Sequence, residues 1–345
     1  MLLLSPTTMT VQQTAELEKY RQQFIERNAD YADWLTQCLQ EKIFADQLCR
    51  TWLGSQFAAD LCIRQPAMFK QLVESQQLHQ IYNESTIHSQ LAELLVNVET
   101  AEQLDQVLRH HRNREQLRVI WRDLNRLASL EETTKDISSL AEASIQQALD
   151  FHHQQLCQRY GTPTAKKSGQ VREQKLLVLG MGKLGAWELN LSSDIDLIFC
   201  YPHSGETQGV EKPLTNSEFF TRLARKLIQS IDQQTADGFV FRVDMRLRPY
   251  GESGALVLSF SALEEYYQDQ GRDWERYAMI KARVVAGETD QGEKLMALLR
   301  PFTYRRYIDF SAVDSLRSMK KMIRKEVQRR HLHNDVKLGA GVFGK

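Results

Sequence analysis

Two acidic residues with i, i+2 spacing open an apolar run near the middle of the chain. They are Asp194 and Asp196, in the segment SSDIDLIF at 192–199. In a β-strand, residues i and i+2 point to the same side, so we expect both carboxylates to project together. Adjacent carboxylates beside a core are electrostatically unfavourable. A hard cation such as Mg²⁺, which prefers oxygen ligands, removes that cost. The alternative is a strand end at which both acids simply reach water.

A third carboxylate interrupts a later apolar run. Asp244 lies in FVFRVDM at 239–245 and is followed by Arg246 and Arg248. We predict that Asp244 completes a three-carboxylate cluster with the paired acids. Such a cluster can hold two metal ions ~3.5–4 Å apart, which stabilise the attacking and leaving oxygens during displacement at phosphorus. The arginines would offset negative charge on the phosphate oxygens. The alternative for Asp244 is a structural ion pair with a nearby arginine.

A glycine-rich turn precedes the paired acids. GMGKLG at 180–185 matches G-x-G-x-x-G, follows a predicted strand and precedes a plausible short helix. A dinucleotide site also needs an acid about 20 residues further on, whereas Asp194 and Asp196 come only 12 and 14 residues after Gly182. A P-loop is excluded because Lys183 is not followed by Ser or Thr. Two interpretations remain: backbone N–H groups that approach a phosphate, or a tight turn without a ligand.

The elements that must position these residues form a small α/β unit. Apolar runs predict strands at 175–179, 194–201 and 239–245, with a possible fourth at 255–258. Between the second and third, Thr215 and Glu218 fit a capping box. The helix that they begin carries a buried stripe at helical spacing, formed by Phe220, Leu223, Ala224, Leu227, Ile228 and Ile231. The order of glycine loop, paired acids, long helix and single acid resembles the order of motifs in the nucleotidyltransferase-β superfamily.

Around this unit the composition predicts helices. Residues 1–165 are rich in Gln, Leu, Glu and Ala and are predicted to form a helical domain, with turn residues at 161–169 that favour a linker. We assign 166–290 to the α/β catalytic domain and 291–345 to a C-terminal helical segment. Its last helix carries clustered Lys and Arg, which predict a solvated face or, alternatively, a phosphate or partner surface. The predicted fold class is α+β and mostly helical, with a nucleotidyltransferase-β-like mixed sheet.

Composition excludes several classes of protein. The 345 residues include 44 basic and 44 acidic side chains, 42% apolar and 26% charged, which is ordinary for a globular chain and excludes general disorder. The balanced charge argues against a nucleic-acid binder. The five cysteines form no CxxC pair and are expected to be reduced thiols. No apolar run approaches the ~18–20 residues of a membrane span, so we expect a cytoplasmic protein without a membrane partner.

Long segments resemble one bacterial family. The stretches at 180–199 (GMGKLGAWELNLSSDIDLIF), 237–260 (DGFVFRVDMRLRPYGESGALVLSF) and 266–283 (YYQDQGRDWERYAMIKAR) are similar to the bifunctional glutamine synthetase adenylyltransferase/adenylyl-removing enzymes. Specifically, they resemble the N-terminal, adenylyl-removing half. LRVIWRDL at 117–124 agrees as well, and the likeness runs from about residue 100 to about 341.

The resemblance implies a concrete reaction. In this family the N-terminal half removes AMP from a tyrosine of adenylylated glutamine synthetase, using inorganic phosphate and releasing ADP, and the C-terminal half adds AMP from ATP. The PII signalling protein is the regulator that the resemblance suggests. The resemblance and the residue pattern together predict metal ligands and catalytic residues (Asp194, Asp196 and Asp244), a phosphate-lining set (Gly182, Lys183 and Ser193) and arginines for the incoming phosphate (Arg246 and Arg248).

The sequence departs from the family at its end. In the family a Gly-Ile-Arg-Glu-Ile-Glu-type segment follows KLGAG, whereas here Gly341 is followed by Val342, Phe343, Gly344 and Lys345. We interpret this as a truncation within the adenylyl-removing half and expect the adenylylating activity to be absent. Two alternatives stay open: an inactive fragment that only docks glutamine synthetase, or an adenylyltransferase that uses ATP.

Overall fold

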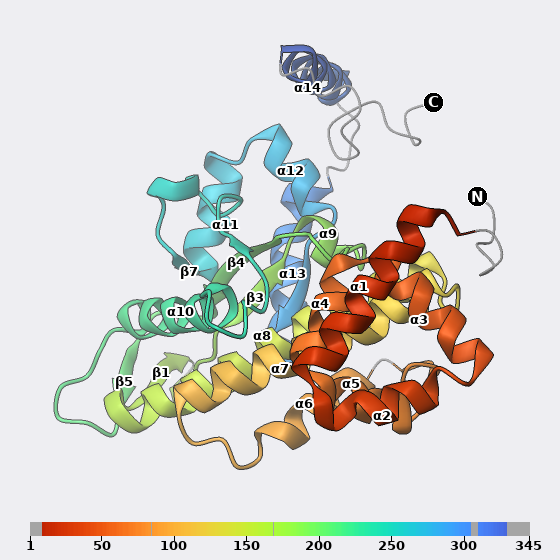
Figure 1. The fold of residues 1–345 in the computed structure, drawn as a ribbon. Helices are drawn as coiled ribbons and strands as arrows, with labels where there is room; N and C mark the ends of the chain where they lie inside the picture. The colour runs from red at the N-terminus through yellow and green to blue at the C-terminus, as the bar shows by residue number, and fades with distance from the viewer. Residues whose placement is uncertain (1–8, 84, 168, 305–309, 330–345) are drawn as a thin grey trace.

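A largely helical chain surrounds a five-stranded mixed sheet and also contains a three-stranded antiparallel sheet (Figure 1). The computed structural model describes residues 9–83, 85–167, 169–304 and 310–329. The N-terminal half is helical: α1 (Val11–Arg27), α2 (Ala29–Cys38), α3 (Lys42–Gly54), α4 (Gln56–Arg64), α5 (Pro66–Glu74), α6 (Thr86–Leu95), α7 (Ala101–Leu124) and α8 (Leu130–Tyr160). With the sheet described below, this confirms the predicted α+β, mostly helical class. No helix within the described ranges is long and apolar enough to cross a bilayer.

The central sheet has the strand order β6-β4-β3-β8, and β7 also pairs with β4. Its strands are β3 (Leu177–Gly180), β4 (Ile195–Tyr201), β6 (Val243–Asp244), β7 (Val257–Ser259) and β8 (Arg283–Ala286). β4 runs antiparallel to β3 and parallel to both β6 and β7. Between these strands lie α9 (Gly182–Gly185), α10 (Asn216–Asp232), α11 (Phe260–Asp269) and α12 (Asp273–Met279), and α13 (Thr289–Thr303) and α14 (Phe310–Arg329) follow.

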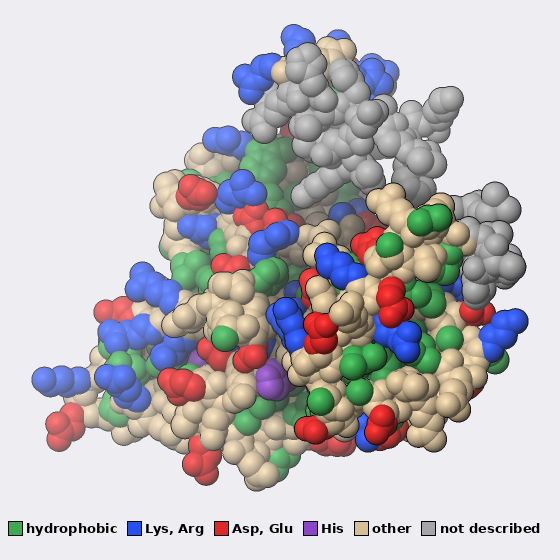
Figure 2. All heavy atoms as spheres, in the orientation of Figure 1, with side chains coloured by type: hydrophobic (Ala, Val, Ile, Leu, Met, Phe, Trp, Pro, Cys, Tyr) green, Lys and Arg blue, Asp and Glu red, His purple; other side chains and the backbone are tan. Residues whose placement is uncertain are grey.

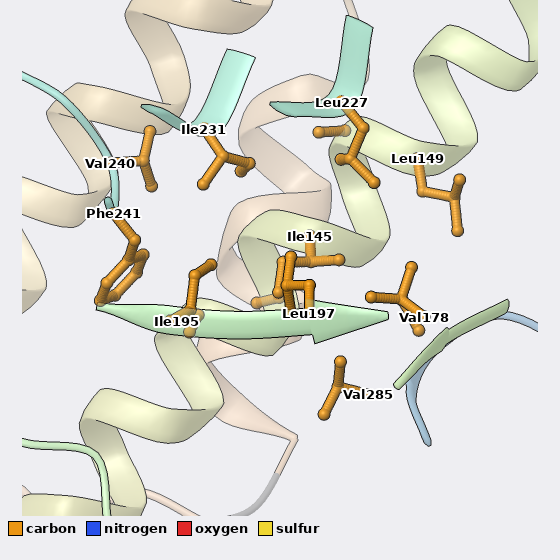
Figure 3. Packing of buried hydrophobic residues seen from close by; sticks show 14 of the residues in the cluster. Ile145, Leu149, Val178, Ile195, Leu197, Leu227, Ile231, Val240, Phe241 and Val285 are labelled. Carbon is orange, nitrogen blue, oxygen red and sulfur yellow. The ribbon is translucent and has the colours of Figure 1, made fainter. Parts of the chain in front are cut away.

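Both faces of the sheet are covered by helices. Alternate strand residues, among them Val178, Ile195 and Leu197, pack in one core with α8 and α10, as Figure 3 shows. The intervening residues, such as Leu179 and Ile198, pack in a second core with α11 and α13. The period-2 alternation of a strand explains this division. A polar side chain that is buried on either face therefore requires a polar or charged partner.

A separate core holds the N-terminal helices together. Trp52 of α3 and Trp121 of α7 lie in it, both almost fully buried. The helix α7 also packs against α8, where Glu115, Arg118 and Asp136 form buried ion pairs. Because α7 and α8 contribute to the core beneath the sheet as well, the N-terminal helices support the α/β unit directly.

The predicted linker at 161–169 is wrong. Residues within it form β1 (Thr162–Lys167), which pairs with β2 (Gln170–Glu173) and β5 (Glu206–Gln208). The backbone explains the two glycines that suggested a linker. A Cβ on Gly161 would lie 2.4 Å from a carbonyl oxygen of β5, and Gly169, at the turn between β1 and β2, has φ +82°. The predicted boundary between residues 165 and 166 falls inside β1, and the division into domains stays a prediction.

The predicted elements of the α/β unit are otherwise largely present. The capping box of α10 is confirmed, with the Glu218 side chain accepting from the Thr215 backbone N–H at 3.0 Å. The third predicted strand is shorter than expected because the N–H groups of Val240 and Phe241 both donate to the carbonyl of Ile231, at the end of α10. The divergent tail at 341–345 lies outside the described residues. The described basic side chains of α14 at 320, 321, 324, 325 and 329 are exposed. Figure 2 shows Lys and Arg side chains gathered at the top of the molecule, where Figure 1 draws α14.

Candidate functional site

Two of the three predicted acids are neighbours across parallel strands. Asp196 of β4 pairs in register with Asp244 of β6, one position after the pair Ile195 and Val243. Because Ile195 and Val243 face the core beneath α8 and α10, alternation places both carboxylates on the opposite face of the sheet. The residues come from segments 48 positions apart in the sequence. Local sequence order alone could not have established their register.

Two of the three predicted acids, Asp244 and Asp194, form ion pairs with arginines. The guanidinium of Arg246 donates to both oxygens of Asp244, with Nε 3.0 and 2.9 Å away, and this bond raises the pKa of Arg246. The carboxylate of Asp194, which precedes β4, accepts from Nε of Arg242 at 2.5 Å. Within the described residues, no three Asp, Glu, His or Cys side chains gather closely enough to hold a metal ion. The three-carboxylate cluster stays a prediction, and the ion pair weighed as the alternative for Asp244 is present.

The glycine loop lies against the start of β4. The backbone N–H of Met181 donates to the carbonyl of Asp196 at 2.9 Å. Gly182 has φ +56°, and a Cβ added to it would lie 3.0 Å from Oδ2 of Asp196. Gly185 is needed for a different reason, since its Cβ would lie 1.9 Å from the carbonyl oxygen of Lys281. Gly182 therefore keeps space open beside one carboxylate, and Gly185 permits a close backbone contact.

The predicted phosphate-lining residues Lys183 and Ser193 meet beside this loop. The Lys183 ammonium donates to the Ser193 hydroxyl at 3.3 Å, and that hydroxyl donates to Oδ1 of Asn190 at 2.5 Å. No carboxylate pairs with Lys183 among the residues that the structure describes. Its positive charge is consequently not neutralised locally, which suits a side chain predicted to face phosphate.

The two predicted phosphate arginines differ in their surroundings. Arg246 is largely exposed. Arg248 instead donates to backbone carbonyls of the loop between β6 and β7, at 2.8 Å to Met245 and 2.9 Å to Glu252. These bonds indicate that Arg248 organises the loop. A role for either arginine in binding phosphate stays a prediction.

Sequence reasoning missed Arg242, and it weighed Arg283 only as a residue that could reach the nucleotide, not as an ion-pair partner. Arg242 belongs to the alternation Arg242, Asp244, Arg246, Arg248, so the period of a strand could have revealed it. Arg283 of β8 forms an ion pair with the buried Glu142 of α8, with Nη1 2.9 Å from its oxygen. Burial raises the pKa of Glu142 although Arg283 opposes that shift. The same guanidinium lies 3.8 Å from the ring centre of Trp187. No local pattern predicts a pair separated by 141 positions.

The donor set at the sheet edge fits a divalent cation in part. Asp196 and Asp244 offer carboxylate oxygens on one face, which are the ligands that Mg²⁺ prefers. The space that a Cβ on Gly182 would fill lies directly beside Asp196. Asp194 would have to exchange Arg242 for the ion. The residues that would hold a first cation are therefore Asp196 and Asp244, with Asp194 at its margin.

Comparisons with known proteins agree on one family. The sequence model of the Glutamate-ammonia ligase adenylyltransferase family matches residues 45–298. A "Bifunctional glutamine synthetase adenylyltransferase/adenylyl-removing enzyme" of Pseudomonas putida is 56% identical over 288 residues, covering 84% of this chain and 29% of that protein. Proteins with the same name from Nitrosococcus oceani and Hahella chejuensis are 55% and 47% identical, covering 85% and 94% of this chain. This chain spans 30% and 33% of their respective lengths.

Proposed function

The chain belongs to the Glutamate-ammonia ligase adenylyltransferase family, and we propose that it carries the adenylyl-removing reaction on adenylylated glutamine synthetase. The observation that carries the proposal is the register pairing of Asp196 with Asp244, beside the space left by Gly182. The choice of removal is supported by the resemblance of segments 180–199 and 237–260 to the adenylyl-removing half of the family. The PII signalling protein is proposed as a regulator on the same resemblance.

The proposed reaction is a phosphorolysis at phosphorus. An oxygen of inorganic phosphate forms a bond to the phosphorus of the tyrosyl-AMP, and the bond from that phosphorus to the tyrosine oxygen breaks. The attacking phosphate loses a proton, and the released tyrosine oxygen gains one. The products are ADP and unmodified glutamine synthetase, so no oxidant, reductant or further co-reactant is needed.

The chain's own residues have distinct proposed roles. Lys183, supported by Ser193, lies where it can neutralise phosphate charge, and the exposed Arg246 can exchange its bond to Asp244 for the incoming phosphate. Asp196 and Asp244 place their carboxylates on one sheet face, and the oxygens of Asp244 become available when Arg246 moves to the phosphate. Magnesium, when bound there, would supply positive charge for the oxygens that enter and leave. Exclusion of a side chain at Gly182 keeps the space beside Asp196 accessible.

Transfer of AMP from ATP is the second candidate, because the family and its relatives are named for adenylyltransferase activity. One experiment separates the two reactions. The chain is incubated with adenylylated glutamine synthetase, inorganic phosphate and Mg²⁺, and ADP is measured. A parallel reaction supplies unmodified glutamine synthetase and ATP, and incorporated AMP is measured.

Removal predicts ADP only in the first reaction, and its loss in Asp196→Asn and Asp244→Asn. The matched control is Asp269→Asn, which removes the same charge at an exposed position on α11. AMP incorporation without ADP formation would favour transfer. Binding of glutamine synthetase with neither product would show a docking fragment and would refute the proposed reaction.

A further inference from the structure

A cavity lies between the N-terminal helices and the α/β unit. Its volume is about 290 Å³. Phe57 of α4 and Arg112 and Gln116 of α7 line one side, and Ser192 and Phe239 line the other. The cavity adjoins the acid site, because Ser193 and Arg242 line it as well. Its most unusual feature is a buried positive charge.

Arg112 is 8% exposed and is enclosed by aromatic rings. Its guanidinium carbon lies 5.3 Å from the ring centre of Phe57 and 5.2 Å from that of Phe239. Its Nη1 donates to Oδ1 of Asn113 at 2.8 Å, but its Nε is buried without a hydrogen-bond partner. No carboxylate in the described ranges forms an ion pair with it. Burial, with a contribution from Arg64, lowers the pKa of Arg112 to about 10, so it remains charged at neutral pH.

A second donor in the same cavity is also unsatisfied. Gln116 lies one helical turn after Arg112 on α7, is 3% exposed, and its Nε2 has no hydrogen-bond partner within the described structure. A buried donor without a partner costs about 1–3 kcal/mol. Residues four apart on a helix lie on one face. Two buried, unpartnered donors therefore line one cavity, and a ligand with acceptor oxygens would satisfy both.

We propose that this cavity binds a small molecule through an oxyanion group, a carboxylate or a phosphate. Rings that flank a guanidinium leave only its edge available, and that edge matches two oxygens of a planar or tetrahedral oxyanion. Gln116 adds a neutral donor, and Phe57 and Phe239 offer an apolar surface to the rest of the molecule. A volume of about 290 Å³ is at the lower end for small-molecule sites, which typically start near 300 Å³.

The cavity shares part of its wall with the acid site. Arg242 lines it, donates to the Ser192 carbonyl at 2.8 Å and holds Asp194. A ligand in the cavity would add negative charge near Arg242, the residue that holds Asp194. Binding at the two sites is therefore expected to be coupled, and such coupling must be reciprocal.

Thermal unfolding with two probes tests the proposal. The chain is titrated with inorganic phosphate and, separately, with succinate, and sodium chloride at matched ionic strength corrects for screening. A ligand that binds only the folded state raises the unfolding midpoint in proportion to its occupancy. We expect a saturable rise with at least one probe, and the probe that acts identifies the oxyanion.

Two variants locate that effect. Arg112→Lys keeps the charge but loses the bidentate edge, and Gln116→Leu removes a donor that makes no bond in the folded chain. Each variant is expected to weaken the binding of the active probe at least tenfold. Arg222→Gln, an exposed arginine near Tyr160, is the matched control and should leave it unchanged. The proposal is overturned if neither probe exceeds chloride, or if Gln116→Leu and Arg112→Lys both respond like the unchanged chain.

Discussion

Replacing Gly182 by alanine should separate backbone strain from damage at the acid site. The residue has φ +56°, a conformation that costs a residue with a Cβ about 1–2 kcal/mol. In addition, the new Cβ would lie 3.0 Å from Oδ2 of Asp196. A comfortable contact is about 3.5 Å, so the carboxylate must move by roughly 0.5 Å. That shift equals the ~0.5 Å within which a binding constellation must be held.

The matched control is Gly209→Ala. Gly209 has φ +91°, and a Cβ there would meet nothing within 4 Å. Urea denaturation should show a loss of about 1–2 kcal/mol in both variants, since both adopt a left-handed conformation. Phosphorolysis of adenylylated glutamine synthetase should fall by about tenfold in Gly182→Ala alone, because a misplacement of about 1 Å can cost about a hundredfold. Equal activity in the two variants would refute the role assigned to Gly182.

Three further perturbations test the energetics of the fold and the site. Burial lowers the pKa of His111 and of His152 to about 4. Below about pH 6.5 the unfolded chain therefore binds more protons than the folded chain. The free energy of unfolding should be at its full value above that pH and lower by about 2 kcal/mol per histidine at pH 5. Urea denaturation against pH checks this, and a flat profile between pH 7 and 5 would contradict it. Arg118→Met removes the ion-pair partner of Asp136 and one of the two ion-pair partners of the fully buried Glu115, which keeps Arg114. It should cost about 3–5 kcal/mol, with a loss below 1 kcal/mol counting against it. Arg242→Gln releases Asp194 and should strengthen Mg²⁺ binding several-fold by calorimetry, whereas weaker binding would show that Arg242 supports the site.

The sequence patterns that predicted the fold were those with a local physical cause. The capping box at Thr215 and Glu218 and the apolar stripe that follows depend on neighbours within a few residues, and the structure confirms both. The linker predicted at 161–169 was wrong because it relied on Gly161 and Gly169, and glycine is equally compatible with a linker and with a close backbone contact. Only the partner strand β5 distinguishes the two at Gly161.

The site was predictable in its residue types but not in its pairings. Strand alternation identified Asp196 and Asp244 as acids out of place, yet their register depends on how β6 meets β4 across a long helix. The ion pair of Arg242 with Asp194 follows from that same register, because the two residues stand one position before Ile195 and Val243. A wider view of the alternation around Asp244 would have included Arg242.

The affinity of the chain for Mn²⁺, an oxygen-preferring ion that is detectable by electron paramagnetic resonance, tests the central claim most directly. It is measured for the unchanged chain, Asp196→Asn, Asp244→Asn and the double variant. If both carboxylates hold one ion, each single variant should bind at least ~100-fold more weakly, about 2.7 kcal/mol, and the double variant little worse than either. Binding in Asp244→Asn as tight as in the unchanged chain would contradict the shared site.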